Sequence, residues 1–181
     1  GREVFFSETN ELVPRTGEGA FLRLKDGTIM HAYTEYVGPG YHDHDPANIM
    51  AIYSNDEGET WSDKKLLVAK DSDAINVMSV SLLRLQNGEI LLIYLRKVKE
   101  NINGTDRVLC RITVRRSTDE CNSWSAPLDA FSDKNHSHIL NNDRVIQLKS
   151  GRIIAPISRY DMTKERPAGA LMFLLSDDNG Q

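Results

Sequence analysis

The chain has 181 residues, of which 40% are hydrophobic and 27% charged, and its formal net charge is −4. This length suffices for a single domain, here residues 1–181, with a real core, and the composition is that of an ordinary globular protein. The balance of charge leaves no basic surface for a nucleic acid. No apolar run approaches the ~20 residues that cross a bilayer. We therefore expect neither a nucleic-acid partner nor a membrane span.

A short motif, SNDEGETW at residues 54–61, recurs along the chain. Its aspartate can turn back onto backbone N–H groups of its own loop, its glycine supplies a positive φ, and its tryptophan offers a large apolar plate. STDECNSW at 117–124 repeats the motif, and SDDNGQ at 176–181 begins a third copy. We predict a structural role for the fixed positions of these three turns, which are Ser54, Asp56, Gly58, Trp61, Ser117, Asp119, Trp124, Ser176 and Asp178.

The motif belongs to a larger repeat. Three segments, 20–33, 81–94 and 144–157, each read as an apolar strand, a tight turn ending in glycine, and a second apolar strand. Asp-Gly and Asn-Gly turns between apolar runs are strong hairpin signals. A third strand then ends at the serine of the turn motif, and a short fourth strand follows. The repeats cover approximately 17–70, 76–132 and 138–181.

A four-stranded antiparallel unit of this kind cannot bury both of its faces alone. Copies stacked around an axis bury them, which favours an all-β fold of the β-propeller type over a β-sandwich. Propellers have about four to eight blades, and the third unit here stops inside its own turn motif. We therefore expect a partial propeller, completed by its remaining half or by a second chain, and an apolar face that makes the isolated chain self-associate.

The turn motif, together with the hairpin before it, resembles the Asp-box, or bacterial neuraminidase repeat, of the sialidase superfamily. The segments TGEGAFLRLKDG at 16–27, NVMSVSLLRL at 76–85 and NNDRV at 141–145 resemble a mostly uncharacterised sialidase-like group. The resemblance implies a six-bladed propeller of sialidase type, of which this chain covers about three blades. It also implies an exo-acting glycoside hydrolase that removes a terminal acidic sugar, such as a sialic acid, from glycans without a cofactor or a metal.

The resemblance also implies particular chemistry. Sialidases bind the substrate carboxylate with three arginines, attack with a tyrosine assisted by a glutamate, and use an aspartate on a loop as acid and base. The first arginine is absent from its matching position, which reads Gly-Glu-Gly at 17–19, and Arg15 lies two residues earlier. Asp43 and Asp45 are both candidates for the acid/base. The tyrosine, the glutamate and the other arginines belong to later blades, outside this chain.

The repeat itself points to further site residues. Propeller sites form at the axis, from the mouths of the innermost strands and the loops after the second strands. Polar side chains at these registers are not needed for packing and require partners or water. The candidates for substrate binding are Arg15, Glu18, Asn76, Arg96, Asn141, Asn142, Arg144 and Arg159. Each has a purely structural alternative, such as a salt bridge of Glu18 with Arg15 or a solvated strand end at Arg96 and Arg159.

Other features leave their interpretation open. The HDHD run at 42–45 offers imidazole and carboxylate groups that could bind a metal, but neighbours in an extended loop point in opposite directions. The sequence does not say whether Cys110 and Cys121 pair. A non-catalytic glycan-binding propeller and a protein-interaction propeller remain alternatives to the hydrolase. We expect a secreted or periplasmic protein, with a cytoplasmic location left open.

Overall fold

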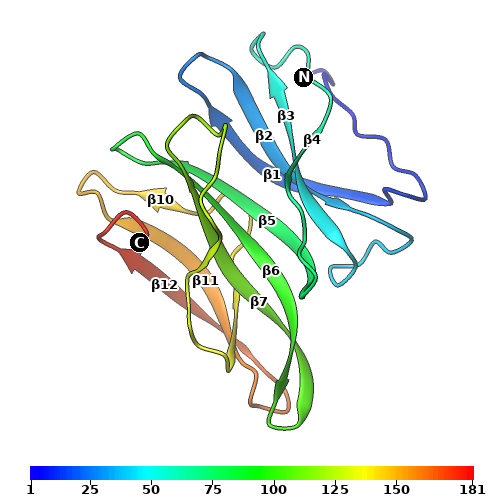
Figure 1. Ribbon diagram of the computed structural model, residues 1–181, viewed down its shortest axis with the longest axis vertical. Helices are drawn as coiled ribbons and strands as arrows, with labels where there is room; N and C mark the ends of the chain where they lie inside the picture. Colours follow the sequence, from blue (N-terminus) through cyan, green and yellow to red (C-terminus); the bar gives the residue numbers. More distant parts are fainter.

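The computed structural model describes residues 1–181, except for the side chain of Glu18. Across the described residues it contains strands and turns, and no helix that could cross a membrane. Three four-stranded antiparallel sheets lie side by side (Figure 1), which confirms the all-β prediction. Sheet 1 comprises β1 (Arg15–Arg23), β2 (Ile29–Tyr36), β3 (Ala47–Ser54) and β4 (Lys65–Val68). Sheet 2 comprises β5 (Ala74–Arg84), β6 (Ile90–Ile102), β7 (Thr105–Ser117) and β8 (Leu128–Asp129). Sheet 3 comprises β9 (His136–Ile139), β10 (Ile146–Gln147), β11 (Ile153–Asp161) and β12 (Gly169–Ser176).

The three predicted hairpins form with one common turn geometry. In the first, the amide of Leu24 donates to the carbonyl of Thr28 at 2.8 Å and the amide of Gly27 donates to the carbonyl of Leu24 at 3.0 Å. The same pair of hydrogen bonds closes the turns at 85–89 and 148–152. β3, β7 and β12 each end at the serine of a turn motif, as predicted.

The first strand of every sheet is irregular. The register of β1 against β2 shifts between Thr16 and Gly19, and that of β5 against β6 shifts between Ala74 and Asn76 and again between Met78 and Ser81. In sheet 3 the irregularity is larger, because residues 140–145 separate β9 from β10 while both pair with β11. β-Bulges of this kind re-aim side chains and are common beside functional sites.

The serine-aspartate turns that follow β3, β7 and β12 contain equivalent hydrogen bonds. In the first turn, the Ser54 hydroxyl donates to the Asp56 carboxylate at 2.8 Å, and the amide and hydroxyl of Thr60 donate to it at 2.9 and 2.6 Å. The turn at 117–124 repeats these contacts, and the third turn makes the serine-to-aspartate bond at 2.6 Å. The fifth residue of the turn takes a positive φ, which is 89° at Gly58 and 67° at Cys121. A glycine adopts this conformation without the strain that a side chain brings, so the second turn is the less favourable one.

The core lies between the sheets. We call the face of a sheet that packs against the next sheet its following face, and the opposite face its preceding face. The first buried cluster joins the following face of sheet 1, including Ile49 and Ala51, to the preceding face of sheet 2, including Leu82 and Leu92. The second cluster joins sheets 2 and 3 in the same way, through residues such as Leu91 and Ile153. Each fully buried aliphatic side chain of this kind contributes about 1.5–3 kcal/mol, so the stacking of sheets supplies the stability.

The two cysteines do not pair. Cys110 is buried beside sheet 3, and Cys121 lies in the second serine-aspartate turn, half-buried against the first cluster. Burial raises the pKa of the Cys121 thiol to about 12, and burial also raises the pKa of Cys110. Both thiols therefore stay protonated near neutral pH and act as small apolar side chains.

The first serine-aspartate turn makes a testable prediction about stability. Hydrogen bonds, first from Thr60, lower the pKa of Asp56 from 3.8 to about 2. The folded state therefore gains stability from the ionised carboxylate, fully present above pH ~4 and lost as the pH falls through the folded pKa. Asp56→Asn should lower the urea concentration at the unfolding midpoint at pH 7. The difference in midpoint between this variant and the wild type should become smaller as the pH falls from 4 to 2. Asp63→Asn, two residues beyond the motif, is the control and should leave the midpoint unchanged; an equal loss in both variants would contradict the role of the turn.

Candidate functional site

The irregular places in the first strands meet at one rim of the molecule. The Ser79 amide donates to the Thr34 hydroxyl at 3.2 Å, and the Asp143 amide donates to the Val80 carbonyl at 3.3 Å. These bonds tie the three sheets together where their first strands bulge. Two adjoining pockets, of about 130 and 410 Å³, open there and share Asp43, Met78, Ser79 and Asn141 in their walls.

The smaller pocket is organised around an ion pair. Arg15 Nη1 lies 2.8 Å from Asp43 Oδ1, and the guanidinium also sits 4.5 Å from the centroid of the Tyr36 ring. The Tyr36 hydroxyl lies 3.3 Å from the same carboxylate oxygen. Arg15 and Asp43 keep 38% and 56% of their side-chain surface exposed, so a ligand can reach both. The Arg15 hydrogen bond is the main cause of a lowered pKa at Asp43, with a further contribution from the charge of Lys97.

Sheet 2 holds the loop that carries Asp43. The fully buried side chain of Asn76 donates to the main-chain carbonyls of Asp43 and Asp45, at 2.9 and 2.8 Å. Lys97, which is 6% exposed, donates to the Asp43 carbonyl at 2.5 Å. Buried hydrogen bonds from a charged donor are among the stronger ones. The position of Asp43 is therefore fixed from a neighbouring sheet, and Asn76 is committed to this loop instead of facing a pocket.

At the ends of the second strands, the alternation of side chains between the two faces decides which of them reach the pockets. Tyr36, Lys97 and Tyr160 occupy equivalent positions of the three repeats, and all three line a pocket. The preceding residues, Glu35, Arg96 and Arg159, fall on the other face because successive side chains of a strand alternate. Accordingly, Glu35 pairs with Lys64 at 2.6 Å, Arg96 pairs with Asp71 through two bonds of 2.6 and 2.7 Å, and Arg159 is exposed outside both pockets.

Of the four residues of the NNDR sequence, at 141–144, only some line a pocket. Asn141 and Asn142 line the smaller pocket, and the buried Oδ1 of Asn142 has no hydrogen-bond partner among the described residues. Burial raises the pKa of Asp143. The exposed Arg144 lies outside both pockets. The side chain of Glu18, the remaining candidate, lies outside the described residues.

The two candidate aspartates differ in what their carboxylates do. Asp45 uses its carboxylate to accept a bond from the His42 amide at 2.7 Å within its own loop, and only Asp43 lines a pocket. His44 lines the larger pocket, while the His42 ring lies against Tyr41. Within the described part of the chain, no group of three His, Cys, Asp or Glu side chains is placed to hold a metal ion.

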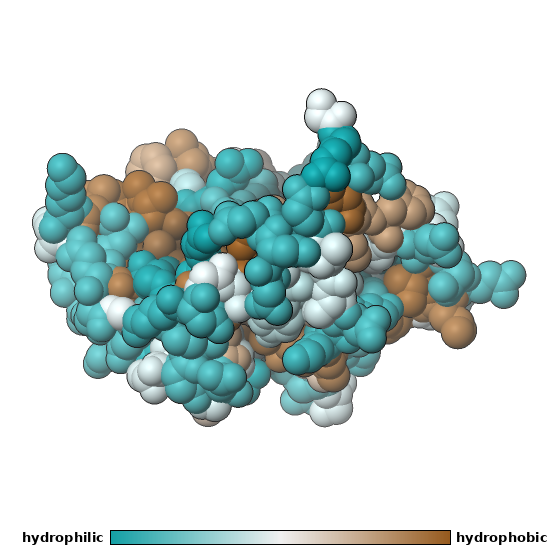
Figure 2. Space-filling view, turned by 90° about the horizontal axis from the view of Figure 1, so that it is seen from above, coloured by the Kyte–Doolittle hydropathy of each residue, from teal (hydrophilic) through white to brown (hydrophobic). Residues whose placement is uncertain are grey.

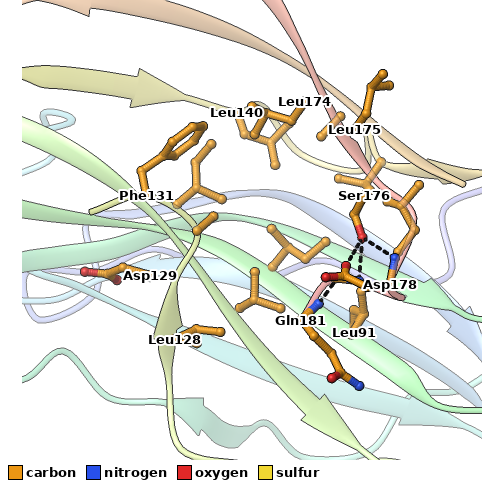
Figure 3. Close-up of a pocket in the computed structure, with 18 of the residues that line it drawn as sticks. Leu91, Leu128, Asp129, Phe131, Leu140, Leu174, Leu175, Ser176, Asp178 and Gln181 are labelled. Carbon is orange, nitrogen blue, oxygen red and sulfur yellow. Dashed lines mark hydrogen bonds between the residues drawn. The ribbon is translucent and has the colours of Figure 1, made fainter. Parts of the chain in front are cut away.

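A larger cavity lies elsewhere and is mainly apolar. It measures about 570 Å³ and lies between sheets 2 and 3, walled by Leu91, Phe131, Leu140 and Leu174 and closed by the turn at 176–181 (Figure 3). The equivalent turn of sheet 2, at 117–124, packs its Trp124 against the first cluster, between sheets 1 and 2. The cavity therefore corresponds to a packing position between sheets, and the polar rim pockets are the better candidate for chemistry.

Comparisons with known proteins identify the fold of the chain but do not assign it to a family. No protein-family model and no curated protein matches the chain. A solved protein of unknown function from Dyadobacter fermentans has a TM-score of 0.76 and 21% identity, over 95% of this chain and 54% of that one. The Hadza microbial sialidase Hz136 has a TM-score of 0.69 and 17% identity, over 94% and 37%. A leech intramolecular trans-sialidase complexed with 2,7-anhydro-Neu5Ac has a TM-score of 0.71 and 14% identity, over 99% and 44%.

At such low identity these likenesses show the fold alone, which is sialidase-like. The chain spans between 37% and 54% of the length of these three solved proteins. Their similarity covers nearly all of this chain, so the three sheets and their stacking correspond to part of each of these proteins.

Sequence reasoning missed Tyr36, Thr34 and Met78 as parts of the rim. Tyr36 is buried by its neighbours yet contributes to the wall of the smaller pocket, and its hydroxyl also lies 3.8 Å from Met78 Sδ. The available signal was the repeat register, because Tyr36 aligns with Lys97 and Tyr160. The position holds the aromatic Tyr36 in the first repeat and the charged Lys97 in the second, and this contrast indicates a position that faces a pocket.

The Arg15–Asp43 pair predicts a specific titration. Arg15→Gln should raise the pKa of the Asp43 carboxyl toward its ordinary value, because the largest cause of the lowered pKa is removed. Carboxyl ¹³C NMR against pH measures it. Arg96→Gln is the matched control: it should release Asp71, whose pKa of about 2 depends on Arg96, and leave Asp43 unchanged. An Asp43 pKa that does not move in Arg15→Gln would contradict the pairing.

The buried anchors predict a second outcome. Asn76→Ala removes one donor to the Asp43 carbonyl and the donor to the Asp45 carbonyl, and Lys97→Met removes the other donor to the Asp43 carbonyl. Each loss weakens the attachment of the loop to sheet 2, since hydrogen bonds contribute about 0.5–1.5 kcal/mol, and those from a charged group more. We expect faster hydrogen exchange and faster proteolysis within residues 37–46, with the other loops unchanged. Lys99→Met, at an exposed position of the same strand, should change neither. Unaltered exchange in both anchor variants would show that the loop is held by something else.

Proposed function

We propose that the chain is part of a six-bladed sialidase-type propeller, with its three sheets as three blades and its serine-aspartate turns as Asp-boxes. We further propose that the rim pockets belong to the active site of an exo-acting glycoside hydrolase that removes a terminal acidic sugar from glycans. The observation that carries the proposal is the solvent-accessible Arg15–Asp43 pair in the smaller pocket. The sialidase-like fold supports it.

Arg15 has the chemistry to recognise the sugar. A guanidinium binds a carboxylate through paired N–H donors, in a planar geometry that an ammonium group lacks. The unpartnered Oδ1 of Asn142 can accept a hydrogen bond from a sugar hydroxyl, and Asn141 lies beside it in the same wall. Glu18, which aligns with Ser79 and Asn142 in the repeat, completes the set to be tested.

Asp43 is the proposed acid and base. In the free protein Arg15 keeps it ionised. A substrate carboxylate that takes over the Arg15 guanidinium removes that partner and adds a nearby negative charge, and both effects raise the pKa of Asp43. Asp43 can then hold a proton and deliver it to the leaving glycosidic oxygen. Binding of an acidic substrate would thus prepare the acid, whereas a neutral sugar would leave it ionised.

A non-catalytic glycan-binding propeller is the second candidate. The observation that favours it is the same lowered pKa, since an ionised carboxylate paired with an arginine is not a proton donor. In this alternative the Arg15–Asp43 pair would only present polar groups to a glycan. A protein-interaction propeller has no specific observation in its favour.

Turnover of a fluorogenic sialoside by the full-length protein separates these candidates, because the nucleophile that the resemblance implies lies outside residues 1–181. For the hydrolase, Asp43→Asn should lower kcat by about 10²-fold or more, the contribution typical of general acid–base catalysis, and Arg15→Gln should mainly raise KM. The control is Arg96→Gln, at a side chain on the opposite face of the sheet, which should leave both constants unchanged. Binding of the sialoside without turnover would establish the second candidate, and neither binding nor turnover would reject both.

A further inference from the structure

Lys97 is a buried cation without an ion pair. The charged side chains of this protein mostly lie at the surface, and hydrophilic residues cover most of the face seen in Figure 2. Lys97, on β6, is only 6% exposed. Its Nζ donates to the main-chain carbonyl of Asp43 at 2.5 Å, and it forms no ion pair within the part of the chain that the structure describes. An ammonium group carries three N–H donors, and burying its charge is unfavourable unless a negative partner is present.

Arg111 shows how the same sheet satisfies an equally buried cation. Its side chain is also 6% exposed, and it lies on β7, the strand next to β6. Two of its nitrogens bond the Glu100 carboxylate, at 2.7 and 3.3 Å, and its nitrogens also donate to the main-chain carbonyls of residues 133, 134 and 136. Lys97 has no comparable set of acceptors, so its charge is available to a ligand.

The side chain of Lys97 lines the larger rim pocket, of about 410 Å³. Ser137 lines it too, and because its hydroxyl accepts a hydrogen bond from the Cys110 amide at 2.8 Å, the hydrogen of that hydroxyl is left to donate. Among the described residues, the acidic side chain in these walls is that of Asp43, which Arg15 already binds. The pocket therefore presents an ammonium and a hydroxyl as donors, which is the chemistry that binds an anion.

Lys97 and Arg15 hold the two ends of one residue. Arg15 contacts the Asp43 carboxylate at 2.8 Å, and Lys97 contacts the main-chain carbonyl of the same aspartate. The two pockets that contain these cations adjoin and share Asp43 and Ser79 in their walls. A single ligand can therefore span them, with one acidic group at each cation. We propose that the larger pocket is a second anion subsite, where Lys97 binds an acidic group that the glycan carries in addition to the carboxylate at Arg15.

This inference rests on the proposed function for the first acidic group and adds the second. The ligand class is a glycan in which another acidic sugar follows the terminal one. The charge of Lys97 also contributes to the lowered pKa of Asp43, and an anion bound at Lys97 offsets that contribution. Both acidic groups therefore raise the pKa of Asp43, so a doubly acidic glycan prepares the acid more completely than a singly acidic one.

Calorimetric titration of the full-length protein tests the subsite. The probes are thio-linked glycosides, which resist hydrolysis: N-acetylneuraminate linked to galactose carries one charge, and N-acetylneuraminate linked to a second N-acetylneuraminate carries two. The wild type should bind the second probe about 10-fold more tightly, as expected for a hydrogen bond between charged groups. Lys97→Met should bind both probes equally, whereas Lys97→Arg, which keeps the charge, should retain a preference. Equal affinity for the two probes in the wild type, or a preference that persists in Lys97→Met, would overturn the proposal.

Two further variants separate the possible causes of a change. Asn76→Ala removes hydrogen bonds to the carbonyls of Asp43 and Asp45 but leaves the Lys97 ammonium in place, so the preference for the doubly charged probe should survive a loosened loop. Arg15→Gln should weaken the binding of both probes. If it had no effect, the hydrolase assignment would fail, while a preference lost in Lys97→Met would still establish the subsite. Binding of neither probe would overturn both proposals.

Discussion

The structure depends on one constraint, which is that each sheet has two apolar faces and can bury them only against neighbouring sheets. Side chains alternate between the faces along every strand, so residues such as Leu91 and Leu92 serve two different cores. Stacking then fixes how the sheets lie relative to one another. It brings the bulged first strands of all three repeats to a single rim, where the polar side chains that stacking does not use are collected.

Local irregularity turns this rim into a candidate site. A regular first strand would continue the alternation and present only core and solvent faces, whereas the bulges at Met78–Ser81 and at 140–145 turn Ser79, Asn141 and Asn142 into the pocket walls. Sheet 2 then fixes the loop of sheet 1 through Asn76 and Lys97. The position of the Asp43 carboxylate is therefore a property of the stack, and a single isolated repeat would not have it.

Much of the fold follows from local sequence. The hairpin turns and the serine-aspartate turns are set by residues a few positions apart, so the pattern predicts them in each repeat. The site is less predictable, because a bulge shifts the register by one residue and moves a side chain to the other face. Even on a regular second strand an error of one residue selects the wrong face, so Arg96 and Arg159 were expected at the site and lie outside the pockets, while their neighbours Lys97 and Tyr160 line one. Arg15, Asn141 and Asn142, which the repeat register anticipates, meet at the rim with Asp43, which the resemblance to sialidases suggested.

The central claim is that the rim recognises an acidic sugar through Arg15. The most direct measurement is NMR of the arginine side chains during titration with N-acetylneuraminate. The Arg15 signal should shift in a saturable way, together with the side-chain amides of Asn141 and Asn142, while Arg96 and Arg159 stay still; a neutral sugar should leave all of them unchanged. Saturable shifts at Arg96 or Arg159 without Arg15, or equal shifts with the neutral sugar, would contradict the assignment of the site.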